Sequence, residues 1–328
     1  MKNPTFLNQP KISEHSVDES RNQIKQELVP KIGEFISNHK LFKDKEVEVT
    51  FAQAGQTSLV SIINAEENKY VLKITLLPKP IEGEGAFLKT WEEDGVSVPH
   101  IVEEGYVGDR PYTLMKYVDA PILGQTYSLE EMLSRNIFHS LGTLLAKMHT
   151  RNVDGYGPIH NSTPDYKTFS EWFPMHISKR LKYTQEHGLL NDSDHGSIDQ
   201  AIEIIKQQAA QDKRSTYCHN DFSAYNVFAT EPLTIFDPTP AFNHPILDLG
   251  LAIIIAVSHY NSEEAAEQMI KGYFGGKDFD RSVLHAAIIV SSHGRIPRWH
   301  TTNRPERIAV IQEYLKKRHI AEGSQLHK

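Results

Sequence analysis

The sequence predicts an α+β fold with two lobes: a small lobe built on an antiparallel β-sheet and a larger, mainly helical lobe. Three observations predict it. The chain has 328 residues, more than one hydrophobic core comfortably supports and about right for two lobes. Before residue 118, short segments alternate apolar and polar residues, as half-buried strands do. Beyond Asp119, apolar residues recur instead at the spacing of one helix face.

The small lobe is expected to span residues 21–118, after a polar tail, residues 1–20, that is expected to be disordered. Apolar side chains at helical spacing indicate a helix over residues 22–37. Residues 84–93 indicate a further helix, inserted among the strands. The strands are expected over residues 47–51, 59–63, 70–74, 101–102 and 112–118. Because their connections are short, we expect them to form an antiparallel sheet.

The large lobe is expected to span residues 119–328 and to be mainly helical. Residues 129–150 give the clearest pattern, with apolar side chains along one face. Segments 226–229 and 233–236 interrupt the helices with a short hairpin. Further helices are expected over residues 198–210, 262–273, 283–292 and 305–317.

The composition excludes several classes of protein. Lys plus Arg is 35 and Asp plus Glu is 42, so the net charge is 35 − 42 = −7, which gives no support to a nucleic-acid partner. The longest apolar run, residues 249–257, is far shorter than the ~20 residues that cross a bilayer, so no membrane association is expected. Cys218 is the one cysteine, so no disulfide forms within the chain. We therefore expect a cytoplasmic protein. The 17 histidines are scattered, without the spacing of a zinc site.

A group of polar residues between positions 217 and 237 indicates chemistry. Asp221 follows His219 by two residues, Asn226 lies five residues further on, and Asp237 comes after the hairpin. Phosphoryl transfer needs a hydroxyl aimed in line and cations that neutralise the phosphates. A carboxylate on a rigid loop can accept the proton of the hydroxyl. An amide oxygen and a second carboxylate can hold Mg²⁺, which prefers oxygen ligands.

This spacing resembles the catalytic and metal-binding loops of the protein-kinase-like superfamily. More narrowly, residues 51–251, and most clearly 219–248, resemble the aminoglycoside phosphotransferase family. The resemblance implies a protein-kinase-like two-lobed fold with the nucleotide in the cleft between the lobes. It also implies a kinase that uses Mg²⁺ and transfers the γ-phosphoryl group of ATP or GTP to a hydroxyl of an antibiotic or metabolite, with antibiotic resistance as one role.

The resemblance assigns roles in the large lobe by position. Asp221 would be the catalytic base, and Asn226 and Asp237 would bind the metal. His219 and Asp248 would hold the loop in place. Asn220 stands where the family often has glycine.

In the small lobe, the resemblance makes Lys73 the residue that anchors the phosphates. Glu84, eleven residues further on, is placed to pair with Lys73. Gly55, between two expected strands, is a candidate for a loop over the phosphates, although a hairpin turn would also explain a glycine there. The hinge, where an adenine would bind the chain, corresponds to Met115, Lys116 and Val118.

The C-terminal region bears on the acceptor. From residue 281 to 320 there are eight basic residues against two acidic ones. Because polycationic aminoglycosides need a carboxylate-lined pocket, this balance favours a neutral or anionic acceptor. Arg295, Arg298 and Trp299 are candidate acceptor-binding residues. A solvated helix face, with Trp299 covering the core, is the alternative.

Two other functions stay open. The chain could be a catalytically silent, kinase-like nucleotide-binding module, or a metal-dependent hydrolase with His219, Asp221, Asp237 and His244 as ligands. As a kinase it would have a small, hydroxyl-bearing substrate as its partner and would act as a monomer or dimer.

Overall fold

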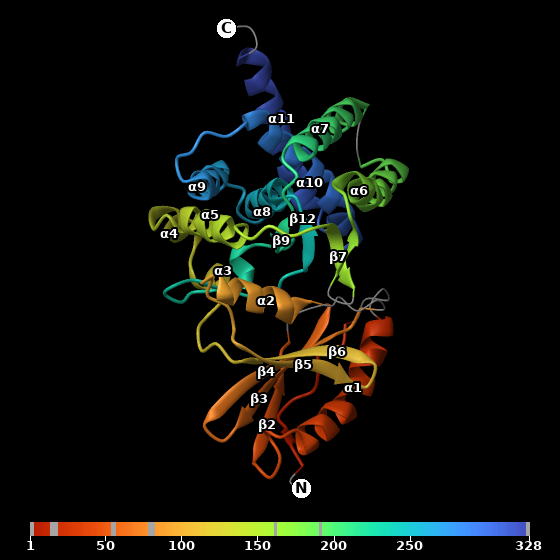
Figure 1. The fold of residues 1–328 in the computed structure, drawn as a ribbon, viewed down its shortest axis with the longest axis vertical. Coiled ribbons are helices and arrows are strands. Elements are labelled where there is room, and N and C mark those ends of the chain that lie inside the picture. The colour runs from red at the N-terminus through yellow and green to blue at the C-terminus, as the bar shows by residue number, and fades with distance from the viewer. Residues whose placement is uncertain are drawn as a thin grey trace. The chain divides into compact units, whose positions relative to one another are not determined.

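The structure, a computed structural model, describes residues 3–13, 19–53, 57–77, 83–160, 163–189 and 192–325. The chain divides into two compact units. The first, here the small lobe, comprises residues 1–93 and 97–119, and the second, here the large lobe, comprises residues 94–96 and 120–328. Figure 1 shows a sheet-based first part and a helical second part.

The small lobe is built on a six-stranded sheet in the order β1-β2-β3-β4-β6-β5. Strands β2 to β6 pair antiparallel, as predicted. The strands are β1 (Thr5–Phe6), β2 (Val47–Phe51), β3 (Ser58–Ala65), β4 (Asn68–Thr75), β5 (Ile101–Val107) and β6 (Arg110–Lys116).

The N-terminal segment differs from the expected disordered tail, because Thr5–Phe6 pairs parallel with β2. The Asn8 side chain extends this pairing: its Nδ2 donates to the Phe51 carbonyl at 2.9 Å, and its Oδ1 accepts from the Phe51 N–H at 2.7 Å. The Phe6 ring also stacks on Phe51, with centroids 5.6 Å apart. A two-residue strand is too short to show an alternating pattern, and its stability comes from these contacts.

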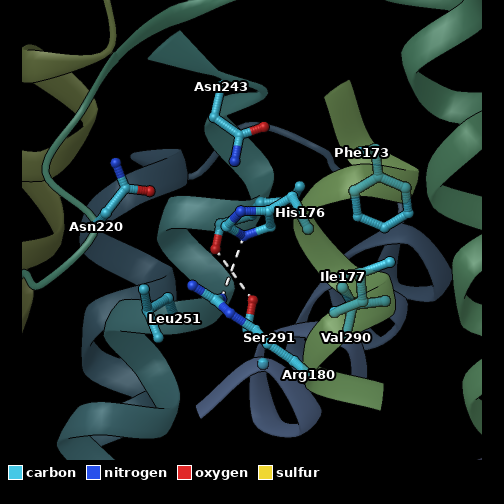
Figure 2. A pocket seen from close by; sticks show the side chains of 11 residues that line it. Phe173, His176, Ile177, Arg180, Asn220, Asn243, Leu251, Val290 and Ser291 are labelled. Atoms are coloured by element: carbon cyan, nitrogen blue, oxygen red, sulfur yellow. Dashed lines mark hydrogen bonds between the residues drawn. The ribbon is translucent and has the colours of Figure 1, made fainter. Parts of the chain in front are cut away.

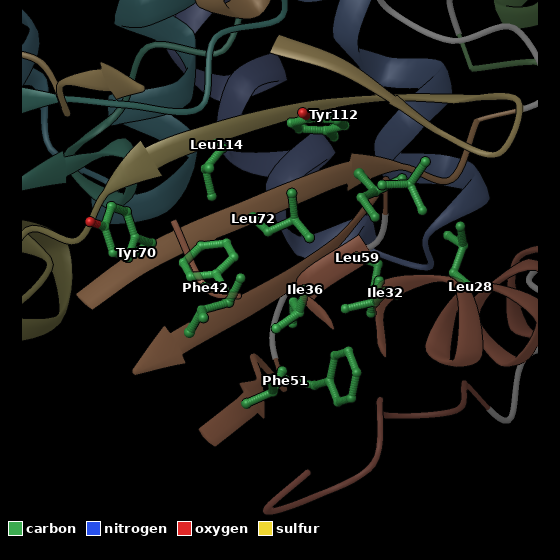
Figure 3. Close-up of a cluster of buried hydrophobic side chains, with 14 of the residues drawn as sticks. Leu28, Ile32, Ile36, Phe42, Phe51, Leu59, Tyr70, Leu72, Tyr112 and Leu114 are labelled. Atoms are coloured by element: carbon green, nitrogen blue, oxygen red, sulfur yellow. The ribbon is translucent and has the colours of Figure 1, made fainter. Parts of the chain in front are cut away.

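Two helices cover the small-lobe sheet, and in the sequence each lies between two of its strands. Helix α1 (Glu19–Asn38) buries Leu28, Ile32 and Ile36 against the sheet in one apolar core, which Figure 3 shows. Helix α2 (Glu84–Glu93) is inserted between β4 and β5 and buries Phe87, Leu88 and Trp91. Both helices were expected, and the apolar spacing that predicted α1 includes Leu28, Ile32 and Ile36, which the helix buries.

The large lobe combines helices with short strands. Strands β8-β7-β12-β9 form one sheet, and β10 pairs with β11 as the expected hairpin. The strands of the large lobe are β7 (Tyr156–His160), β8 (Thr163–Tyr166), β9 (Thr216–Cys218), β10 (Val227–Phe228), β11 (Thr234–Ile235) and β12 (Ala241–Asn243). Its helices are α3 (Leu123–Thr126), α4 (Leu129–Ser134), α5 (Ile137–Met148), α6 (Phe169–Glu186), α7 (Asp192–Gln211), α8 (Pro245–Tyr260), α9 (Glu263–Phe274), α10 (Arg281–Thr301) and α11 (Pro305–Gln325).

The single helix expected over residues 129–150 is two helices, α4 and α5. Asn136 between them adopts a left-handed conformation, with φ 53° and ψ 34°. Asparagine tolerates this region better than other residues that carry a β-carbon, so it ends one helix and starts the next without disturbing the apolar pattern. The apolar spacing therefore carried no sign of the break.

The apolar run of residues 249–257 belongs to α8, which is buried on nearly all sides. Pro245 starts the helix, a position where its missing N–H loses no hydrogen bond. Helix α10 packs closely across α8 near Gly250. Among the described helices, none combines the length and apolar character that a crossing of a lipid bilayer requires.

Candidate active site

The loop after β9 is fixed by the buried carboxylate of Asp248, near the start of α8. Its Oδ2 accepts from the His219 N–H at 2.7 Å, and its Oδ1 accepts from the Asn220 N–H at 2.8 Å. Two charge-assisted bonds to consecutive amides hold the loop against the helix. Asn220 has φ 55°, which explains why a residue that tolerates the left-handed region stands here.

Asp248 has a further partner, His149, at the end of α5. The His149 Nε2 lies 3.1 Å from Asp248 Oδ2, and its Nδ1 lies 2.9 Å from the Tyr273 hydroxyl. Burial acts to raise the pKa of Asp248, but its hydrogen bond to His149 and the hydrogen bond from the His219 N–H outweigh it, so the pKa is lowered. Asp248 thus stays ionised as the anchor of the loop.

His219 supports the loop in its neutral form. Its Nδ1 accepts from the Asp221 N–H at 3.3 Å, so the ring proton lies on Nε2, which donates to the Phe236 carbonyl at 3.0 Å. Complete burial lowers the pKa of His219, in agreement with a neutral ring. The histidine therefore connects the loop that carries Asp221 to the end of the hairpin before Asp237.

The hairpin brings Asn226 and the residues before Asp237 together. Asn226 ends a 3-10 turn (Ala224–Asn226), and β10 pairs with β11 so that Val227 faces Ile235. The Phe236 N–H donates to the Asn226 carbonyl at 3.0 Å, and Asn226 Nδ2 donates to the Asp221 carbonyl at 2.8 Å. With Nδ2 used in this way, the amide oxygen of Asn226 is the atom left to bind a cation.

Asp237 follows directly in a left-handed conformation, with φ 59°. The hydrogen bonds described above thus link the segments that carry Asp221, Asn226 and Asp237. The Asp237 carboxylate and the Asn226 amide oxygen are the kind of ligands that Mg²⁺, a hard cation, prefers.

Asp221 itself is paired with Arg295, from the middle of α10. The Arg295 Nη2 donates to Asp221 Oδ1 at 2.8 Å, and the two side chains are 17% and 27% exposed. The position of α10 against α8, which holds the loop, sets this contact. The sequence predicted Arg295 as an acceptor-binding residue and gave no sign of its contact with Asp221.

In the small lobe, Lys73 and Glu84 form the expected pair, with Nζ and Oε1 2.6 Å apart. Their side chains are 13% and 14% exposed, so water screens the pair only weakly. Lys73 lies on β4, in register with Val60 and Thr113 on the flanking strands, and Glu84 is the first residue of α2.

The remaining small-lobe candidates have different outcomes. Gly55 lies outside the described residues. Met115 and Lys116 are the last two residues of β6, and Val118 follows the strand. The Lys116 side chain turns to β4, where its Nζ donates to Asn68 and Tyr70. The role of this segment in adenine binding stays a prediction.

Two other candidates lie on the last turns of α10. Trp299 is 3% exposed, as the alternative of a core-covering residue requires. Arg298 is exposed near the end of the helix. Sequence reasoning missed His149 as a partner of Asp248, although a histidine that ends an amphipathic helix was visible in the sequence.

The two histidines proposed as hydrolase ligands hydrogen-bond to the backbone, His219 through both ring nitrogens and His244 through one. His219 uses both ring nitrogens in the loop, and the Nδ1 of His244 accepts from the Ile246 N–H at the start of α8. In the part of the chain that the structure describes, the one group with metal-ligand spacing is His149, Cys218 and Asp248, all buried. The hydrogen bonds of His149 and Asp248 described above already account for this group.

Comparison with known proteins agrees with this arrangement. The chain has the two-lobed, kinase-like fold of solved small-molecule phosphotransferases. A thermostable mutant of the aminoglycoside phosphotransferase APH(4)-Ia, in ternary complex with ADP and hygromycin B, superposes with a TM-score of 0.60 at 13% identity, over 83% of this chain and 94% of that one. A choline/ethanolamine kinase family protein from Mesorhizobium loti gives 0.58 at 17% identity, over 87% and 91%.

Spectinomycin phosphotransferase APH(9)-Ia, in complex with ADP and spectinomycin, gives 0.56 at 14% identity, over 88% of this chain and 93% of that one. The profile of the phosphotransferase enzyme family (APH) matches residues 48–286. The chain belongs to this family and is a phosphotransferase, as the sequence predicted. No curated protein sequence matches it significantly.

Proposed function

We propose that the chain transfers the γ-phosphoryl group of ATP, or of GTP, to a hydroxyl of a small metabolite or antibiotic, with Asp221 as the base. The observation that carries this proposal is the fixed position of Asp221. The Asp248 carboxylate accepts hydrogen bonds from the backbone N–H groups of His219 and Asn220, and the His219 ring accepts one from the N–H of Asp221 itself. A carboxylate held in this way can orient a hydroxyl for in-line attack.

The transfer forms one bond and breaks another. The bond between the acceptor oxygen and the γ-phosphorus forms as the bond from that phosphorus to the β–γ bridging oxygen breaks, which leaves ADP or GDP. Asp221 takes the hydroxyl proton. Asn226 and Asp237 would hold Mg²⁺, which neutralises phosphate charge when bound. Lys73, oriented by Glu84, would bind phosphate oxygens.

Membership of the phosphotransferase enzyme family supports this proposal. So does the likeness of fold to proteins whose structures contain ADP with hygromycin B or spectinomycin. A cytoplasmic location, a monomeric or dimeric state and any role in antibiotic resistance stay predictions.

A nucleotide-consumption screen tests the proposal. Purified protein with Mg²⁺ and either ATP or GTP is offered aminoglycosides, other antibiotics, sugars, amino alcohols and hydroxy acids, and release of ADP or GDP is measured. We expect acceptor-dependent release with the wild type and a loss of about 10²- to 10⁴-fold with Asp221→Asn. Nucleotide binding without turnover on any acceptor would instead support the silent binding module.

Metal analysis tests the second alternative. A kinase of this kind is expected to bind Mg²⁺ weakly and together with the nucleotide. Tightly held Zn²⁺ or Mn²⁺ in the purified protein, with hydrolysis in the absence of nucleotide, would support the hydrolase. The use of both ring nitrogens of His219 in hydrogen bonds to the backbone speaks against that outcome.

A further inference from the structure

A pocket lies within the large lobe beside Asp221. Helix α6 supplies His176 and Arg180, the loop after β9 supplies Asn220, and α10 supplies Ser291 and Gly294. Figure 2 shows His176, Arg180, Asn220 and Ser291 together with apolar side chains of the lining, among them Phe173, Ile177 and Val290. Asn220 and Gly294 directly precede Asp221 and Arg295 in the sequence. The pocket, here called the Arg180 pocket, therefore adjoins the ion pair between α10 and the catalytic loop.

The guanidinium of Arg180 reaches the helix that carries Arg295. Its Nη1 lies 3.2 Å from His176 Nε2 and 3.2 Å from where a Cβ on Gly294 would stand. Desolvation and then the positive charge of Arg295 lower the pKa of Arg180. Burial and the charge of Arg180 lower the pKa of His176 to about 3, so His176 is neutral and accepts from Arg180. Among the described residues, no carboxylate pairs with Arg180.

Arg295 is also incompletely partnered. Its Nη2 donates to Asp221, but its Nε is buried without a hydrogen-bond acceptor among the described atoms. An unpaired buried donor is costly, because it has lost its bonds to water and gained none. Of the two neighbouring guanidinium groups, Arg295 pairs with one carboxylate, Asp221, and Arg180 pairs with none among the described residues.

Further positive charge lies near Arg295 and Asp221. Burial lowers the pKa of His259 to about 4, and the charges of Arg307, Arg295 and Arg304 lower it further, against the opposing effect of Asp221. Such an excess of cations repels a cationic acceptor and attracts an anionic one.

We propose that the Arg180 pocket binds an anionic group of the acceptor, a carboxylate or a phosphate, through Arg180 and Arg295, while the acceptor hydroxyl faces Asp221. This inference rests on the proposed function and specifies its substrate class: a hydroxy acid or a phosphorylated alcohol. A guanidinium suits both anions, because its fork of N–H donors matches pairs of oxygens. Polycationic aminoglycosides are excluded by like charge.

Matched acceptors provide the first test. The nucleotide-consumption assay is run with pairs that differ only in the anion: glycerate against glyceramide, gluconate against glucose, and glycerol phosphate against glycerol. We expect kcat/KM to be higher for the anionic member by about 10- to 100-fold, since charged hydrogen bonds contribute about 1.4–2.8 kcal/mol in such a comparison. The pairs also distinguish a carboxylate from a phosphate.

Variants identify the residues responsible. Arg180→Gln and Arg295→Gln should each remove most of the preference for the anionic member. Arg281→Gln is the matched control and should keep the preference for the anionic member. Arg281 is an exposed arginine on α10, the helix of Arg295, and its guanidinium stacks on the Phe279 ring. Equal turnover of neutral or cationic acceptors would overturn this inference and leave the proposed function intact.

A binding measurement keeps the inference testable if no acceptor is turned over. Inorganic phosphate is titrated calorimetrically into the wild type, Arg180→Gln and Arg281→Gln, with Lys73→Met run in parallel to separate phosphate held by the small lobe. We expect Arg180→Gln to weaken phosphate binding by about 10-fold or more, and Arg281→Gln to leave it unchanged. Unchanged phosphate affinity in Arg180→Gln would overturn the inference, whatever the outcome of the turnover assay.

Discussion

Arg295 and Asp221, 74 residues apart in sequence, form an ion pair with Nη2 and Oδ1 2.8 Å apart. The carboxylate proposed as the base therefore has two supports: its own loop fixes its backbone, and a helix from the far end of the chain fixes one of its oxygens. The second carboxylate oxygen of Asp221 is the atom we expect to receive the acceptor hydroxyl.

Asp221→Asn should lower kcat by about 10²- to 10⁴-fold, because the amide cannot accept the hydroxyl proton. Nucleotide affinity should stay within about twofold, since neither the metal candidates nor Lys73 is changed. Single-turnover kinetics and a nucleotide titration measure the two effects. Asp109→Asn, an exposed carboxylate in the turn between β5 and β6, is the matched control. Weakened nucleotide binding with normal turnover of bound substrate would contradict the role of Asp221.

Asp237→Ala should weaken nucleotide binding in the presence of Mg²⁺ by about 10-fold or more and should have little effect without the metal, because it removes an oxygen ligand. Nucleotide titrations at several Mg²⁺ concentrations measure this difference. Asp278→Ala, an exposed carboxylate between α9 and α10, should behave as the wild type. An unchanged dependence of affinity on Mg²⁺ would show that Asp237 is not a metal ligand.

The sequence predicted best what is set by local spacing. The resemblance to the phosphotransferase family led us to expect Lys73 and Glu84, eleven residues apart, to pair, and the structure pairs them. The hairpin between Asn226 and Asp237 was likewise visible, because its two strands are neighbours in the chain.

Contacts between distant segments could not be predicted in this way. The pairing of β1 with β2 depends on the Asn8 amide and on Phe6, across more than forty residues. The break at Asn136 depends on one left-handed residue within an unbroken apolar pattern. The contact of Arg295 with Asp221 depends on how α10 packs against α8, which periodicity does not encode.

Lys73→Met should lower kcat/KM for the nucleotide by about 100-fold, because it removes the charge proposed to bind phosphate oxygens. Glu84→Gln should have a smaller effect, since it only releases the lysine. The double variant should be little worse than Lys73→Met, with a coupling free energy of about 0.5–3 kcal/mol. Lys69→Met, an exposed lysine on the same strand, is the control. Additive effects of Lys73→Met and Glu84→Gln would show that the pair does not act as a unit.

His244→Asn should reduce the acid sensitivity of the fold. His244 caps α8 in its neutral form, and burial lowers its pKa from 6.5 to about 4. As the pH falls, the histidine therefore takes up a proton in the unfolded chain before it does so in the folded one. The contribution of His244 to the free energy of unfolding is thus fully present above about pH 6.5 and declines towards pH 4, by up to about 3 kcal/mol. Asparagine also caps helices but does not titrate there.

Urea unfolding at pH 7.5 and pH 4.5 measures this effect. His244→Asn should lose about 2–3 kcal/mol less than the wild type between the two pH values. His139→Asn, an exposed histidine on α5, should lose as much as the wild type. Equal losses in His244→Asn and the wild type would mean that His244 is not held neutral in the fold.

Gly250→Ala should lower the free energy of unfolding by about 1–3 kcal/mol, because a Cβ at residue 250 would stand 2.7 Å from the Ala287 carbonyl oxygen and force α8 and α10 apart. Gly33→Ala is the matched control. Gly33 lies inside α1, and a Cβ there would make ordinary van der Waals contacts with the Phe6 ring, at 3.6 Å, and with Pro4, at 4.0 Å, so this change should raise the free energy of unfolding by about 0.5–1 kcal/mol. Urea unfolding of both variants measures the opposite signs of the two changes in the free energy of unfolding.

Because α8 carries Asp248 and α10 carries Arg295, Gly250→Ala should also lower turnover in the folded protein, whereas Gly33→Ala should leave it unchanged. A stabilising effect of Gly250→Ala would show that the two helices do not approach as closely at residue 250 as the structure indicates.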